Sequence, residues 1–275
     1  MKLALMSRKN AYFILSILVI LSLLMAYQQR QTGLSFKEIL LGVEVPEFSA
    51  YTNVQEKKKA FFDYFLPLID EKNRQLTQDR ERIIRLSRQP ELKGSDLDWL
   101  GALADHYQLT TQGVFGAKDF EALLMRVDIL PSSLVLSQAA IESAWGSSRF
   151  AEEAYNYFGE WCFTKRCGLI PNARDAGAKH EIRLFHSPAQ AVSAYFLNLN
   201  RHPGYRQLRQ LRAQALAQGK PAGGCLLSLG LEAYSERGRE YINDIRQMIR
   251  VNNLELATAN DCSPLSTDVA VGLEG

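Results

Sequence analysis

The residue whose type and position most clearly indicate a catalytic role is Glu142. It is the one charged residue in the stretch from Leu134 to Trp145. This stretch is apolar on almost every face, which is typical of a buried helix. Near the C-terminal end of such a helix, lost hydration and the helix dipole both raise the pKa of a carboxyl group. A carboxyl group that stays protonated near neutral pH can act as a general acid. A structural glutamate, satisfied by a backbone amide or by Arg149, is the alternative interpretation.

The elements that must position Glu142 are mostly helices. Pro131 and the two serines after it supply start signals for the helix of Glu142, and Gly146 stops it. A strand from Cys167 to Ala173 can pair with a strand from Glu181 to His186. Other helices are predicted over Val54–Gln89 (kinked or split at Pro67), over Asp96–Tyr107, over Ala117–Val127, from Pro188 to Pro203 with a capping box at Ser187, and over Leu231–Leu254.

The first thirty residues differ in character from the rest of the chain. Lys2, Arg8 and Lys9 precede an uncharged run from Ala11 to Tyr27, at the short end of the length that spans about 30 Å of hydrocarbon. Basic residues ahead of the run place the N-terminus in the cytoplasm. We expect a single-pass signal anchor in the inner membrane, with the remaining chain in the periplasm. A cleaved secretory signal, which would leave a periplasmic protein, is the alternative.

The composition of the whole chain excludes several classes. The chain has 275 residues, 32 Lys and Arg against 30 Asp and Glu, and 47% hydrophobic residues. Such a balance argues against a disordered chain. It also argues against a nucleic-acid partner, because nucleic-acid binders usually show a strong basic excess.

The four cysteines all follow the predicted anchor, so export would place them where oxidation is allowed. Cys162 and Cys167 are close enough in sequence for a local disulfide, and Cys225 with Cys262 would then tie down the C-terminal segment. A zinc site is the alternative, but the sequence has no C-x-x-C or H-x-x-C pattern. We expect two disulfides, no metal and no other cofactor.

Changes in composition divide the chain into five parts. They are a cytoplasmic stub with the transmembrane anchor (1–30), a tether (31–55), a helical extension packed on the main domain (56–129), the domain with Glu142 (130–257) and a flexible tail (258–275).

Three motifs in a fixed order carry a family resemblance. Gln138–Gly146 (QAAIESAWG) is followed by Tyr155–Gly159 (YNYFG) and by Ile182–Phe185 (IRLF). This order resembles the glucosaminidase family of peptidoglycan hydrolases. The segments Phe61–Pro67 and Arg126–Pro131 look like its Bax-type Gram-negative branch, which carries an N-terminal helical extension.

The resemblance covers roughly 131–254, and it implies an α+β, mostly helical fold. The implied fold is a lysozyme-like domain with a small β-hairpin lobe, here preceded by the transmembrane helix and the helical extension. The cleft would lie between the lobe and the helix of Glu142, and Glu142 falls on the family's general acid. The other residues expected to shape the cleft or bind sugars are Trp145, Tyr155, Asn156, Phe158, Trp161 and Tyr195. For any one of the aromatic residues, packing of the lobe is an equally good interpretation.

The catalytic base is less evident. Some relatives have a second glutamate in the first hairpin strand, but Gly168–Ala173 contains no carboxylate. Asp175 in the turn and Glu181 on the return strand are our candidate bases, and Glu160 is the other nearby acid. All three are more typical of solvated surface charges. A mechanism assisted by the substrate's own 2-acetamido group needs no base there.

These inferences favour an endo-β-N-acetylglucosaminidase that cleaves β-1,4 bonds of peptidoglycan glycan strands, with Glu142 as general acid. A lytic transglycosylase, which also works with one glutamate, is a second hypothesis. A non-catalytic cell-wall-binding or scaffold module is a third.

Overall fold

The computed structural model describes residue 22 and residues 44–111, 113–171, 179–255 and 262–265. Apart from Ser22, the predicted membrane anchor lies outside the described residues. None of the described helices is both long enough and apolar enough to span a lipid bilayer.

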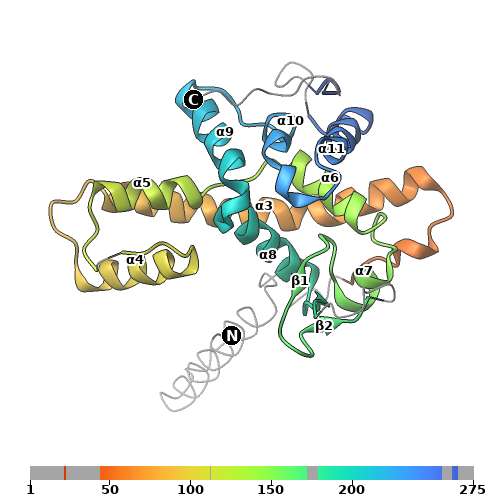
Figure 1. Ribbon diagram of the computed structural model, residues 1–275, viewed down its shortest axis with the longest axis horizontal. Coiled ribbons are helices and arrows are strands. Elements are labelled where there is room, and N and C mark those ends of the chain that lie inside the picture. Colours follow the sequence, from red (N-terminus) through yellow and green to blue (C-terminus); the bar gives the residue numbers. More distant parts are fainter. Residues whose placement is uncertain (1–21, 23–43, 112, 172–178, 256–261, 266–275) are drawn as a thin grey trace, which may run out of the picture.

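The described chain is mostly helical and carries one small sheet, which confirms the predicted α+β class (Figure 1). The elements, in chain order, are η1 (Phe48–Ala50), α3 (Val54–Leu86), α4 (Gly94–His106), α5 (Ala117–Arg126), α6 (Ser132–Glu142), α7 (Arg149–Ala154), β1 (Trp161–Cys162), β2 (Gly168–Leu169), β3 (Glu181–Arg183), α8 (Pro188–Arg201), η2 (Pro203–Tyr205), α9 (Arg206–Ala217), α10 (Gly224–Leu227), η3 (Ser228–Gly230), η4 (Glu232–Tyr234) and α11 (Arg239–Val251).

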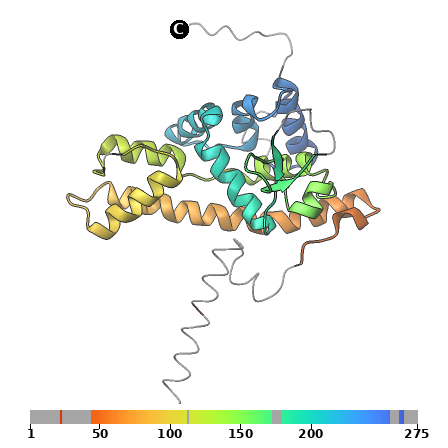
Figure 2. The same cartoon turned by 60° about the horizontal axis from the view of Figure 1, so that its bottom comes forward.

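The long helix α3 is the spine of the molecule, and most other helices lie on one side of it (Figure 2). It begins where the side chain of Asn53 accepts hydrogen bonds from the amides of Gln55 and Glu56. Of the kink or split predicted at Pro67, the split is wrong, because the helix continues through this residue. Pro67 and Asp63 are both exposed, so the carbonyl group that loses its helical partner can be solvated by water.

The buried face of α3 shares one core with the domain that follows it. Its apolar residues, among them Phe61, Phe65 and Ile69, belong to the same cluster as Leu134 of α6 and Tyr195 of α8. This arrangement confirms that the helical extension packs on the main domain. Figure 1 shows α4 and α5 at one end of α3 and the small sheet beside α7 toward the other.

The segment Val45–Ala50, here called the strap, packs against the body instead of forming a free tether. Phe48 is only 1% exposed, and its ring centroid lies 5.3 Å from that of Phe61 and 6.5 Å from that of Phe65. A buried phenylalanine contributes about 3–5 kcal/mol to stability, judged by the cost of removing such a ring. The strap is therefore part of the folded domain.

The predicted helix Leu231–Leu254 is wrong in its first part. Only the short turn η4 forms there, and α11 begins at Arg239. Gly238 has a φ of +49°, which is incompatible with a continuous right-handed helix. The interruption frees Tyr234 from the helix and allows its ring to stack on Tyr241.

The small sheet, here called the lobe, has the strand order β1-β3-β2 with both pairs antiparallel. Gly168 pairs with Arg183 and Leu169 with Ile182, which confirms the predicted hairpin. Strand β1, which sequence reasoning missed, adds Trp161 opposite Ile182. A side chain at Gly168 would collide with the carbonyl oxygen of Ile182, because its Cβ would lie 1.8 Å away.

Both predicted disulfides are present, Cys162–Cys167 in the lobe and Cys225–Cys262 at the C-terminal side. Guanidinium groups of α11 hold the segment around Cys262, with Arg250 donating to its carbonyl oxygen at 3.1 Å and Arg246 to that of Ser263 at 2.8 Å. Residues 262–265 are thus tied to the body, as the predicted Cys225–Cys262 disulfide implies, although they fall within the segment predicted to be a flexible tail. Residues 266–275 lie outside the described residues.

Replacing Cys162 and Cys167 together by serine is expected to lower the free energy of unfolding by about 2 kcal/mol, because the disulfide closes a short loop. Urea denaturation of the double variant and the wild type, both without reductant, would measure the difference. A loss below about 0.5 kcal/mol would contradict a stabilising role for this disulfide.

Candidate active site

Helix α6 ends at Glu142, three residues earlier than the pattern predicts. The next residues form a left-handed turn in which Ala144, Trp145 and Gly146 have φ values of 49°, 58° and 78°. Two of them are not glycine, and such a conformation persists only where the surroundings enforce it. The side chain of Ser143 helps by accepting a hydrogen bond from the amide of Gly146 at 2.8 Å.

The start of α6 also differs from the prediction, because no side chain caps it. Pro131 is the N-cap residue, and Ser133 instead donates to the carboxylate of Glu255 at 2.5 Å. The predicted burial of the helix is confirmed, since every residue from Ser133 to Ala140 is buried.

The strap and α3 enforce the turn that follows Glu142. A Cβ atom at Gly146 would lie 2.3 Å from the ring of Phe48, so only glycine fits. The ring of Trp145 meets Phe61 and Phe62 edge-on, at centroid distances of 5.7 and 5.3 Å. Trp145, predicted as a substrate-binding residue, therefore packs against α3.

The carboxyl group of Glu142 is more than half buried, and burial raises its pKa above the ordinary value of 4.5. A hydrogen bond from the hydroxyl of Tyr241 and the positive charge of Arg237 act in the opposite direction. The direction agrees with the one expected from the apolar helix. Gly159 lies directly against this carboxyl group, since a Cβ atom there would sit 3.3 Å from Oε2.

Gln138, one helical turn before Glu142, links α6 to two buried tyrosines. Its side-chain nitrogen donates to the hydroxyl of Tyr241 at 2.8 Å, and its oxygen accepts from the hydroxyl of Tyr195. Tyr241 thus joins Gln138 to Glu142. Sequence reasoning placed Gln138 on the same helix face as Glu142 but missed Tyr241, which follows about a hundred residues later.

A wall of aromatic residues continues from this network. Tyr234 stacks on Tyr241 with a centroid distance of 5.4 Å, and its hydroxyl donates to the carbonyl oxygen of Phe158 at 2.7 Å. The ring of Phe158 stacks on Tyr195 at 4.2 Å. Phe158 and Tyr195, both predicted to bind substrate, are buried and build the wall behind Glu142.

Asn156 shapes the loop that brings Gly159 to Glu142. Its side-chain nitrogen donates to the carbonyl oxygens of Glu160 at 2.8 Å and Arg183 at 2.9 Å, and its oxygen accepts from the amide of Glu160 at 3.0 Å. Asn156 is itself fully buried. Its observed role is to clamp this loop to β3.

Comparison with known proteins identifies the family of this chain. Residues 117–254 match the family model Glucosaminidase, described as mannosyl-glycoprotein endo-beta-N-acetylglucosaminidase. The chain is also 32% identical over 213 residues to Protein bax of Escherichia coli (strain K12). The aligned region covers 78% of this chain and 76% of that protein. The chain belongs to the glucosaminidase family. No solved structure matches it significantly.

The glucosaminidase match begins at α5, inside the predicted helical extension. Membership in the family supports a glycosidase activity for this chain. The matched residues do not include the strap or α3, which hold the turn after Glu142.

Of the predicted sugar-binding residues in this glucosaminidase family member, Trp161 is exposed and Tyr155 is partly exposed. Trp161 is 55% exposed, and its ring stacks on His180 at a centroid distance of 4.1 Å. The other ring face of such an indole can receive a sugar. Tyr155 lines a cavity of about 370 Å³ together with the strap and Gly146.

The expectation that Glu181 is a solvated surface charge is wrong. It is buried, and its carboxylate accepts hydrogen bonds from the amides of Arg166 at 3.0 Å and Gly168 at 2.9 Å. These contacts fasten the disulfide loop to β3. Its role as a base stays a prediction, and Asp175, the other candidate base, lies outside the described residues.

Glu160 is not a surface charge either. Its side chain is only 12% exposed, and burial raises its pKa to about 7. Arg201 of α8 and Tyr205 of η2, both distant in sequence, lie within electrostatic range of its carboxyl group. No local pattern signals this burial.

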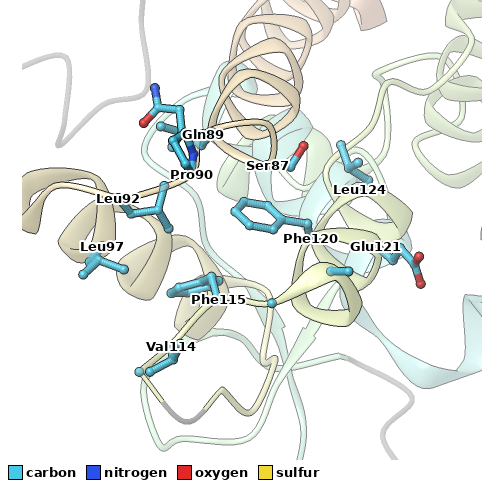
Figure 3. A pocket seen from close by; sticks show the side chains of 14 residues that line it. Ser87, Gln89, Pro90, Leu92, Leu97, Val114, Phe115, Phe120, Glu121 and Leu124 are labelled. Atoms are coloured by element: carbon cyan, nitrogen blue, oxygen red, sulfur yellow. The ribbon is translucent and has the colours of Figure 1, made fainter.

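Another cavity, of about 570 Å³, lies where the end of α3 meets α4 and α5. Figure 3 shows the ring of Phe120 at its centre, with Leu92 and Leu97 on one side and Leu124 on the other. None of the residues around Glu142 lines it, so it is separate from the candidate active site.

Proposed function

We propose that this glucosaminidase family member is an endo-β-N-acetylglucosaminidase that hydrolyses β-1,4 bonds of peptidoglycan glycan strands. Glu142 is its general acid, and the catalytic domain faces the periplasm behind the anchor predicted at 11–27. The observation that carries the proposal is the environment of Glu142: a half-buried carboxyl group with a raised pKa, held by Tyr241 at the end of a buried helix.

In this mechanism the protonated Glu142 donates its proton to the glycosidic oxygen as the bond to the anomeric carbon breaks. The carboxylate that forms keeps the hydrogen bond from Tyr241 and the nearby charge of Arg237. Both stabilise negative charge on Glu142, and therefore favour proton transfer to the substrate. A water molecule then adds to the sugar and returns a proton to Glu142.

The nucleophile that we propose is the 2-acetamido oxygen of the substrate. The support is that Glu181 already accepts two backbone hydrogen bonds in the lobe. A carboxylate fixed in this way has less freedom to activate water. Assistance by the substrate requires no second carboxylate at that position.

The decisive experiment incubates the purified full chain in detergent with peptidoglycan sacculi, followed by borohydride reduction and mass spectrometry of the fragments. We expect fragments that end in reduced N-acetylglucosamine. Fragments that end in 1,6-anhydromuramic acid would indicate a lytic transglycosylase instead. Binding to sacculi without cleavage, for the wild type and Glu142→Gln alike, would indicate a non-catalytic module.

The hydroxyl of Tyr241 offers a test of the acid assignment. Tyr241→Phe removes a hydrogen bond that favours the charged carboxylate, so the pKa of Glu142 should rise. The loss of kcat/KM at high pH should then move upward by about one pH unit, since hydrogen bonds to charged groups are worth about 1.5 kcal/mol or more. A pH–rate profile measures this shift, with Tyr51→Phe, a change at an exposed residue directly after the strap, as the control. If the pH at which kcat/KM falls is unchanged or lower in Tyr241→Phe, the assignment of Glu142 as the acid is contradicted.

A further inference from the structure

Glu160 has a largely buried carboxyl group that the proposed mechanism does not use. Its Oε2 lies 3.5 Å from a guanidinium nitrogen of Arg183, a long contact with a residue that is half exposed. Its Oε1 is buried and, among the described residues, has no hydrogen-bond partner. An ionised carboxylate in this setting would leave one oxygen unsatisfied, which is costly in a buried site.

The main chain of Glu160 is part of the loop that touches Glu142. The side chain of Asn156 holds both its amide and its carbonyl group, and the preceding Gly159 lies against the carboxyl group of Glu142. The Glu160 side chain is thus attached to a backbone segment that the proposed general acid contacts.

Within the described part of the chain, the charged and titratable groups that act on Glu160 come from three elements. Arg183 of β3 and Arg201 of α8 favour the carboxylate, while Tyr205 of η2 is a neutral neighbour at physiological pH. The charges of Glu160 and Glu142 both raise the pKa of Tyr205, so Tyr205 lies within electrostatic range of both carboxyl groups.

We propose that Glu160 is a positioning residue for Glu142 and that it performs this role only in its protonated form. The inference rests on the proposed function, since it concerns the same reaction. When protonated, Glu160 stays in its buried site and the loop stays in place. When ionised, its unsatisfied oxygen must attract Arg183 or water, and either movement pulls the loop away from Glu142.

Burial and the two nearby arginines together set the pH at which Glu160 ionises. Burial raises its pKa to about 7, more than Arg183 and Arg201 lower it. The folded protein thus binds an extra proton between about pH 4.5, the ordinary value, and about pH 7. The stability due to that proton is present at the acid end of this window and is lost as the pH rises through 7.

The test compares the pH–rate profiles of the full-length wild type and Glu160→Gln, which mimics the protonated form. If two groups must be protonated, wild-type kcat/KM should fall about 100-fold per pH unit above both pKa values, against about tenfold for Glu160→Gln. Glu153→Gln, an exposed carboxyl change on α7, is the control and should keep the steeper limb. An inactive wild type would refute the proposed function. An active wild type with the same limb as Glu160→Gln would refute only the role of Glu160.

Two further measurements separate a positioning role from a merely structural one. Arg183→Met removes a charge that favours the carboxylate, so the second titration should move to higher pH. Glu160→Gln should also weaken the fall of the melting temperature between pH 5 and pH 8. Loss of activity of a folded Glu160→Gln variant at every pH would overturn the proposal, because the carboxylate itself would then be required.

Discussion

Glu142→Gln is expected to lower the rate of glycan cleavage by about 10²- to 10⁴-fold, the usual contribution of a general acid. Glutamine has nearly the same shape as glutamic acid and can accept the hydrogen bond from Tyr241. It cannot supply a proton to the glycosidic oxygen, so the chemical step fails while binding persists. Release of reducing ends from sacculi, measured for both proteins at the same pH, tests this.

The same substitution should leave the fold intact or stabilise it. Because the pKa of Glu142 is raised in the folded state, the wild type loses stability as the pH rises from about 4.5 through that raised value. Glutamine is uncharged and avoids the cost of removing a carboxylate from water. The melting temperature of the variant at pH 7 should therefore equal or exceed that of the wild type. Glu153→Gln, with an exposed carboxyl group, should keep full activity. If Glu142→Gln retains substantial activity, another residue is the acid.

Phe48→Ala is expected to cost about 3–5 kcal/mol of folding free energy, although the residue lies in a segment whose sequence predicts a tether. The ring is fully buried among Phe61, Tyr64 and Phe65 and presses on Gly146. Its removal opens a cavity directly beneath the left-handed turn. Urea denaturation at constant pH measures the change.

Tyr51→Ala is a matched control, because Tyr51 follows the strap directly and is exposed. Its cost should stay within about 0.5 kcal/mol. Glycan cleavage should also weaken in Phe48→Ala at temperatures where the variant is still folded, since the turn that ends α6 loses its support. A cost below about 1 kcal/mol would show that the strap is not part of the stable core.

Much of the fold was predictable because local signals coincide with structural boundaries. Ser187 and Pro188 begin α8 where the capping pattern indicates, with the hydroxyl of Ser187 accepting from the amide of Gln190. The end of α6 was not predictable, because the left-handed turn depends on Phe48 and Phe61, which are distant in sequence. The break at Gly238 left a weaker signal, a glycine inside an otherwise helical pattern.

The candidate site divides in the same way. Glu142 stands out in the sequence because a single charge interrupts an apolar helix, and Gln138 lies on the same face. Tyr241 and Glu160 do not stand out, since their roles depend on contacts made across the fold. For the same reason Trp145, Phe158 and Tyr195 have packing contacts that a motif cannot distinguish from sugar binding.

The close fit between Phe48 and Gly146 has a consequence for recombination between relatives. A chimera that exchanges only residues 117–254 would combine a turn shaped for one aromatic ring with a strap from another parent. Such a junction would separate the helix that carries Glu142 from the residues that support its end. The smallest segment that relatives could exchange without disturbing this contact therefore begins before Phe48. The donor segment must include its own strap and its own helix α3.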